Sequence, residues 1–197
     1  MRWGTFTSSN SVLLLIDHQV GTMKLIQNIP FETAKRNTLA LTKAAKILGM
    51  PIILTTGTEN GFQGPLLPEF KELVPEAYDA RIARSGVVNT WEDPEFRAAV
   101  EKTQRSHLIM AGVTTDVCLY SPALSAVEDG YPVQAVLDAS GSPTELSEQL
   151  ARQRMERGGV TLTATNTLIA ELARDWSRPE GSELLKLMVD DVLPPVF

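Results

Sequence analysis

The sequence predicts an α/β fold in which helices cover both faces of a parallel β-sheet. Five short apolar segments rich in Val, Ile and Leu recur between longer amphipathic stretches, and a sixth, weaker segment follows the second of them. Each strand of a sheet covered on both faces buries both of its sides, so its sequence is almost continuously apolar. The predicted strands are 12–16, 52–55, 78–83 (the weaker segment), 107–111, 133–137 and 160–163.

The stretches between these strands show helical periodicity with recognisable ends. Apolar residues recur at helical spacing over 31–48, and a glycine and a proline follow before the next strand. Asp93 and Pro94 form an N-cap and first-turn pair that opens a helix over 94–100. Pro122 predicts an irregular start for the helix after Cys118, because it lacks an amide. The remaining predicted helices are 145–157, 166–173 with Asn166 as its cap, and 183–189.

Composition limits the domain count and the kinds of partner. The 197 residues are 43% hydrophobic and 21% charged, which predicts one globular domain over 1–197. A net charge of -6 and a pI near 5.0 argue against nucleic acid or an anionic membrane as partner and favour a small molecule. One cysteine cannot form an intramolecular disulfide, and no secretory core precedes the 12–16 run, which is too short to span a bilayer. These features predict a cytoplasmic protein.

Three reactive side chains follow three different predicted strands. Asp17 ends the first strand, Arg84 the third, and Cys118 lies in the segment after the fourth. In open parallel sheets, sites form beyond the carboxyl ends of the strands, so an acid, a cation and a thiol are expected to converge there. The arrangement is that of a catalytic site in outline.

Cys118 is the only cysteine and lies where an apolar run gives way to small polar residues at the start of a helix. Amides at a helix N-terminus favour thiolate over thiol, which predicts a nucleophile. The alternative is a small buried side chain without chemistry.

Asp17 is the expected base for this thiol. Neighbouring residues of an extended segment point to opposite faces, so only one of Asp17 and His18 faces Cys118, and His107 lies at the other end of its strand. Arg84 would hold negative charge in place without donating a proton. The alternatives are a surface aspartate that caps a turn and a surface ion pair of little energetic value.

The predicted pocket wall combines the long loop over 57–68 with four side chains. These are Gln19, Phe62, Trp91 and Tyr120, for which packing in the core or an interface is the alternative. The sequence contains no dinucleotide or phosphate-loop motif and no metal-ligand spacing, so we expect neither a cofactor nor a metal.

Three segments carry a resemblance to a known family. They are 12–19, 84–91 and 111–118, in that order, and the match extends through 122–126, 138–141 and 171–176. In these residues the chain resembles the isochorismatase-like hydrolases, the cysteine-hydrolase superfamily that includes nicotinamidases and carbamoylsarcosine amidohydrolases. It is most similar to the YcaC-like bacterial subgroup.

The resemblance implies a three-layer fold with sheet order 3-2-1-4-5-6 and a triad in which Asp17 is the general base and Cys118 the nucleophile. Arg84 occupies the position where lysine is usual. The resemblance also implies a cis peptide bond between Val113 and Thr114, an oxyanion hole made by the amides of Thr114 and Cys118, and a homo-oligomer, which is an octamer in the YcaC-like subgroup. The metal ligands of nicotinamidases are missing from 55–68.

These expectations lead to one functional hypothesis and two alternatives. The hypothesis is a metal-independent cysteine hydrolase that cleaves a C–N bond of a small amide or carbamoyl compound through a thioester. A redox-active thiol protein would also use Cys118, although the chain has no resolving cysteine. A non-catalytic ligand-binding or assembly protein on the same fold is the third class.

Overall fold

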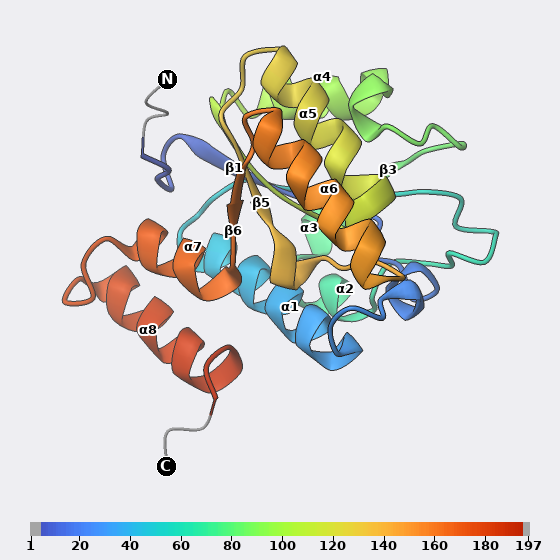
Figure 1. Cartoon of the computed structure of the whole chain (residues 1–197). Helices are drawn as coiled ribbons and strands as arrows, with labels where there is room; N and C mark the ends of the chain where they lie inside the picture. The colour runs from blue at the N-terminus through green and yellow to red at the C-terminus, as the bar shows by residue number, and fades with distance from the viewer. Residues whose placement is uncertain (1–4, 195–197) are drawn as a thin grey trace.

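A computed structural model describes residues 5–194 and shows a six-stranded parallel sheet with helices on both faces (Figure 1). The strand order is β3-β2-β1-β4-β5-β6, so the predicted fold class and order are confirmed. Residues 1–4 and 195–197 of the predicted domain lie outside the described residues. The strands are β1 (Ser11–Ile16), β2 (Ile52–Thr56), β3 (Ile82–Ala83), β4 (His107–Gly112), β5 (Val133–Val136) and β6 (Thr161–Thr163).

The helices divide into two layers because successive strand residues point to opposite faces. Leu13 and Leu15 of β1 pack with α1, α2 and α7, whereas Val12 and Leu14 pack with α4, α5 and α6. The longer helices are α1 (Phe31–Ile47), α4 (Pro94–Lys102), α5 (Tyr120–Glu128), α6 (Glu145–Arg157), α7 (Thr165–Ala173) and α8 (Pro179–Asp191). The shorter ones are η1 (Thr22–Leu25), α2 (Glu69–Leu73), α3 (Pro75–Asp79), η2 (Thr90–Glu92), η3 (Thr115–Leu119) and η4 (Leu137–Ala139).

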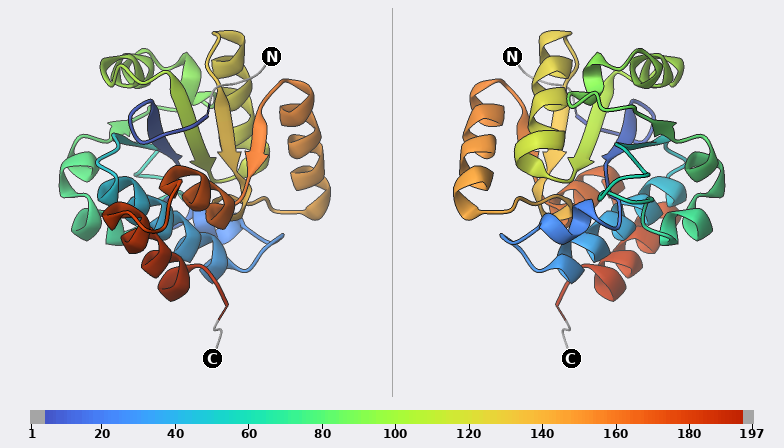
Figure 2. Two further views of the ribbon diagram at one scale, coloured as in Figure 1. Left: turned by 90° about the vertical axis from the view of Figure 1, so that its left-hand side faces the viewer. Right: turned by 90° about the vertical axis from the view of Figure 1, so that its right-hand side faces the viewer.

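Helix α8 packs on the outside of the helical layer that contains α1 and α7. Figure 2 shows it lying against α1 and α7, away from the sheet. Leu184, Leu187 and Met188 of α8 pack there against Ala44 and Ile169. Among residues 5–194, no helix combines the length and the apolar character that a bilayer crossing requires.

Two local expectations are wrong for reasons visible in the structure. The weak segment 78–83 contributes only Ile82 and Ala83 to the sheet, because Tyr78 belongs to helix α3, which opens at Pro75. Asn166 does not cap α7: the helix begins one residue earlier, and its first amide donates to Asp138 from η4 at 2.8 Å.

The last helix is longer than predicted: α8 begins four residues before the expected 183–189 and ends two residues after it, with Pro179 in its first turn. Other predicted ends agree with the structure. The Asp93 side chain caps α4 by accepting from two backbone amides, and α6 spans the predicted 145–157. The start of α5 is irregular, as Pro122 indicates: a π-helical turn, η3, precedes it and contains Cys118. Such turns are rare and frequently occur at functional sites.

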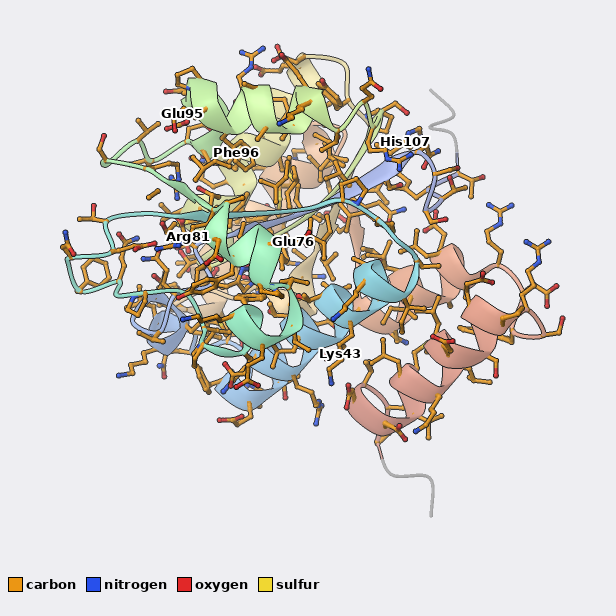
Figure 3. All side chains as sticks on the ribbon, turned by 180° about the vertical axis from the view of Figure 1, so that it is seen from behind. Lys43, Glu76, Arg81, Glu95, Phe96 and His107 are labelled. Atoms are coloured by element: carbon orange, nitrogen blue, oxygen red, sulfur yellow. The ribbon has the colours of Figure 1, made fainter. Side chains whose placement is uncertain are left out.

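The two histidines lie in different places relative to the carboxyl ends of the strands. His107 is the first residue of β4, at the amino end of the sheet, and Figure 3 shows it on the side opposite Arg81. His18 follows β1, is completely buried, and its Nε2 lies 2.9 Å from the carbonyl of Ala139. Burial lowers the His18 pKa from 6.5 to about 4, so the ring is neutral near neutral pH and Nε2 donates to the carbonyl.

We expect His18 to make the protein sensitive to mild acid. The unfolded state binds a proton near pH 6.5 and the native state only near pH 4, so stability is complete above the first value and falls as the pH drops toward the second. The loss between pH 7 and pH 5 should be about 2 kcal/mol.

Urea unfolding at the two pH values measures this effect. His18→Gln should flatten the pH dependence, whereas the matched control His107→Gln should keep it. An unchanged slope in His18→Gln would contradict the assignment of the acid sensitivity to this ring.

Candidate active site

A buried ion pair joins the ends of β1 and β3. Asp17 directly follows β1 with a φ of 57°, a left-handed conformation in which aspartate is better tolerated than bulky residues. Its Oδ1 accepts a hydrogen bond from Nη2 of Arg84, 67 positions away. The two side chains are 3% and 2% exposed, so each charge depends on the other for compensation.

Two further hydrogen bonds hold the Arg84 guanidinium. Its Nε donates to Oγ1 of Thr55 at 3.1 Å, and its Nη1 donates to the carbonyl of Val87 at 2.5 Å. The guanidinium is therefore fixed from three directions, by the ends of β1 and β2 and by the loop after β3. The Thr55 contact was not anticipated from the sequence, where the only signal was a pair of hydroxyl residues, Thr55 and Thr56, at the end of an apolar strand.

Cys118 lies in the π-helical turn η3 with 9% of its surface exposed. Burial raises the pKa of the thiol, and the charge and hydrogen bonding of Asp17 raise it further; a backbone hydrogen bond from Thr114 and the charge of Arg84 lower it by less. The resting sulfur is thus a thiol near neutral pH. This corrects the expectation that helix amides would favour thiolate, because burial beside a carboxylate outweighs them.

The segment before the thiol has an unusual backbone. The Val113–Thr114 peptide bond is cis, and the Thr115 amide donates to the Gly141 carbonyl at 2.8 Å. The Thr114 amide faces the sulfur. The Cys118 amide donates to the Thr114 carbonyl at 2.8 Å, so the two expected oxyanion donors differ: one faces the sulfur and the other is already engaged within the turn.

Gln19 and Trp91, two of the four side chains expected in the pocket wall, are instead buried in the protein interior. The expectation that they line the pocket is therefore wrong. Gln19 is fully buried; its Oε1 accepts from the Gly57 amide at 2.8 Å and its Nε2 donates to the Gly64 carbonyl at 2.5 Å. The Gln19 side chain thus holds the two ends of the loop after β2 together. Trp91 is 4% exposed within the core, and its indole donates to Asp129 at 2.9 Å.

The other two expected pocket residues reach the surface. Phe62 is 75% exposed on the loop after β2, which projects from the body of the molecule in Figure 1. Tyr120 begins α5, and the Arg154 guanidinium lies over its ring at 4.4 Å from the centroid. Val88 and Val117, which the sequence did not point to, are also exposed beside Arg84 and Cys118 in the chain.

A cavity of about 670 Å³ lies away from this cluster. It is found between the end of α1 and helices α2 and α3, where Met50, Leu73 and Val74 line it. In the part of the chain that the structure describes, no group of three His, Cys, Asp or Glu side chains is placed to hold a metal ion.

The chain matches proteins of one family over most of its length. Residues 11–167 match the isochorismatase domain. The probable hydrolase YcaC of Escherichia coli is 42% identical over 168 residues, which covers 85% of this chain and 80% of that protein.

Solved structures of YcaC proteins share the whole fold. YcaC from E. coli, described as an octameric hydrolase of unknown specificity, superposes with a TM-score of 0.92 at 39% identity and covers 98% of this chain and 93% of its own. YcaC from Pseudomonas aeruginosa, solved with hexane-2,5-diol and covalent acrylamide, gives 0.91 at 37% identity with coverage of 98% and 94%. The chain therefore belongs to the isochorismatase domain family and is similar throughout to YcaC hydrolases.

Proposed function

We propose that this protein is a metal-independent cysteine hydrolase that cleaves a C–N bond of a small amide or carbamoyl compound through a thioester. One observation carries the proposal: the Cys118 thiol is buried beside the carboxylate of Asp17, which Arg84 holds in place. A protonated thiol next to an oriented carboxylate is the pairing that a general base needs in order to activate a nucleophile.

The first half of the reaction forms the acyl-enzyme. Asp17 takes the thiol proton as the sulfur attacks the carbonyl carbon, and the oxygen becomes an oxyanion. The Thr114 amide donates a hydrogen bond to the oxyanion and so stabilises its charge. The Cys118 amide donates a second one while it keeps its hydrogen bond to the Thr114 carbonyl. The C–N bond then breaks, protonated Asp17 gives its proton to the departing nitrogen, and a thioester remains.

The second half releases the acid. Asp17, again a carboxylate, takes a proton from water, whose oxygen attacks the thioester carbon. The C–S bond breaks, and the proton returns from Asp17 to sulfur. Arg84 keeps its charge throughout and donates no proton, so its role is to hold Asp17 and to balance negative charge.

The relatives support a reactive nucleophile and an assembly of several copies. The P. aeruginosa YcaC structure contains covalent acrylamide, an electrophile that bonds to nucleophiles through its carbon–carbon double bond, and the E. coli protein is described as octameric. We infer that this chain also has a reactive nucleophile and forms a homo-oligomer. The region between Thr55 and Pro68 carries no His and Asp ligand cluster, which supports chemistry without a metal.

The direction of the thiol pKa favours hydrolysis over redox sensing. Redox-sensor cysteines depend on thiolate character and access, and usually have a resolving cysteine nearby. Here burial and Asp17 keep the sulfur protonated, and the sequence contains no second cysteine.

Replacement of the proposed nucleophile tests the covalent mechanism. Small amides and carbamoyl compounds are screened for turnover, and acyl adducts are trapped and detected by mass spectrometry. Cys118→Ala should abolish both signals. Asp17→Asn should lower kcat by about 100-fold or more, because the base is lost.

Three outcomes of that screen are informative. Full activity in Cys118→Ala contradicts the covalent mechanism. Rapid oxidation of Cys118 by peroxide without amide turnover supports the redox alternative. A wild-type thiol that neither turns over amides nor reacts with iodoacetamide supports a non-catalytic protein.

The pH dependence of alkylation tests the environment of the thiol. Only thiolate reacts with iodoacetamide, and the native pKa lies above the ordinary value of about 8.5, so the rate should keep rising at pH values where the unfolded chain has levelled off. The chain in urea is the matched control, because Cys118 is the only cysteine.

Asp17→Asn separates the two contributions to this profile. It should move the native midpoint to lower pH, since a negative charge that raises the thiol pKa is removed, while amide turnover falls. A native midpoint below that of the unfolded chain would contradict the structure of the site.

A further inference from the structure

We propose that Thr55 is a positioning residue for the reaction, whose hydroxyl fixes the Arg84 guanidinium beside Asp17. This inference rests on the proposed function and deepens it. It adds to the three proposed catalytic residues a fourth residue, which acts through the cation.

The direction of each hydrogen bond around Thr55 follows from chemistry. Arg84 Nε can only donate, so Thr55 Oγ1 accepts at 3.1 Å. The hydroxyl has one proton, and it goes to the carbonyl of Ile82 at 2.8 Å. Thr55 is completely buried and Arg84 is 5% exposed, so water offers no replacement for the hydrogen bond between them.

The same residue also contacts the other half of the ion pair. The Thr55 carbonyl accepts a hydrogen bond from the Asp17 amide at 3.0 Å. Thr55 is therefore hydrogen-bonded to both members of the pair, with its backbone to Asp17 and its side chain to Arg84. This places it between the ends of β1 and β3, where the two charges meet.

The strand β3, which directly precedes Arg84, has little other support. β3 contains two residues and lies at the edge of the sheet, where it pairs with β2 alone among residues 5–194, with Thr55 opposite Ile82. Few backbone hydrogen bonds therefore hold it in place. The Thr55 hydroxyl joins the Ile82 carbonyl of β3 to the guanidinium two residues further on, so it sets both the strand and the side chain.

Loss of the Thr55 hydroxyl should displace the Arg84 guanidinium and leave the rest of the site in place. Thr55→Val keeps the shape of the side chain but leaves Arg84 Nε and the Ile82 carbonyl without their buried partner. The guanidinium then keeps only Asp17 and the Val87 carbonyl, and it can turn away from the sulfur. Arg84 is one of the two groups that ease thiol ionisation, so its displacement makes the thiol harder to deprotonate.

The experiment compares Thr55→Val with Thr55→Ser and with a matched control. Thr42→Val also removes a fully buried hydroxyl, which donates to the Thr38 carbonyl at 2.9 Å inside α1. For each variant we would measure kcat and KM on an amide substrate, the pH profile of Cys118 alkylation, and thermal unfolding.

Thr55→Val should lower kcat by about tenfold, leave KM unchanged, and move the alkylation profile to higher pH. Thr55→Ser should keep the wild-type kcat and the wild-type alkylation profile. Thr42→Val should change neither of these two quantities, although it lowers the stability of the protein. If Thr55→Val does not fold, Thr55→Ala carries the same expectation.

Two results would overturn the inference. One is a Thr55 variant with wild-type kcat and alkylation profile, and the other is an equal loss of kcat in Thr42→Val, which would mark the effect as general destabilisation. The alkylation profile needs no substrate, so it tests Thr55 even if Cys118→Ala keeps its activity and the proposed hydrolysis fails.

Discussion

The buried pair of Asp17 and Arg84 is the interaction on which the rest of the site depends. Both charges are almost completely removed from water, and each is compensated by the other. Removal of one partner would leave the other charge buried, which typically costs about 3–5 kcal/mol, far more than the loss of a surface ion pair. This one electrostatic contact therefore holds the carboxyl ends of β1, β2 and β3 together.

Burial is the main reason why the thiol is protonated, and the two members of this pair act on its pKa in opposite directions. A lone carboxylate would hold the proton on Cys118 strongly, and a lone guanidinium would release it. Together they leave a sulfur that is protonated at rest and that has a carboxylate ready to accept the proton. The site is therefore prepared for an attack in which proton transfer accompanies bond formation.

The sequence predicted the parts of the site that follow from strand periodicity and order. Near-continuous apolar runs identified β1, β2, β4, β5 and β6, and the rule for carboxyl strand ends brought Asp17, Arg84 and Cys118 into one neighbourhood. The protonated thiol was not predictable, because its cause is tertiary burial beside a residue about a hundred positions away. The bracing role of Gln19 was hidden for the same reason: its partners belong to a distant loop.

The positive charge follows a two-residue strand at the edge of the sheet, and this has a consequence for how the site can change. Asp17 and Cys118 follow β1 and β4, which lie in the interior of the sheet with a neighbour on each side, whereas Arg84 follows a two-residue edge strand. Changes around α3 and β3 can thus exchange or re-aim the positive group without repacking the centre. An arginine where the resemblance leads one to expect lysine is a substitution of this kind, because it keeps the positive charge that the buried carboxylate of Asp17 requires.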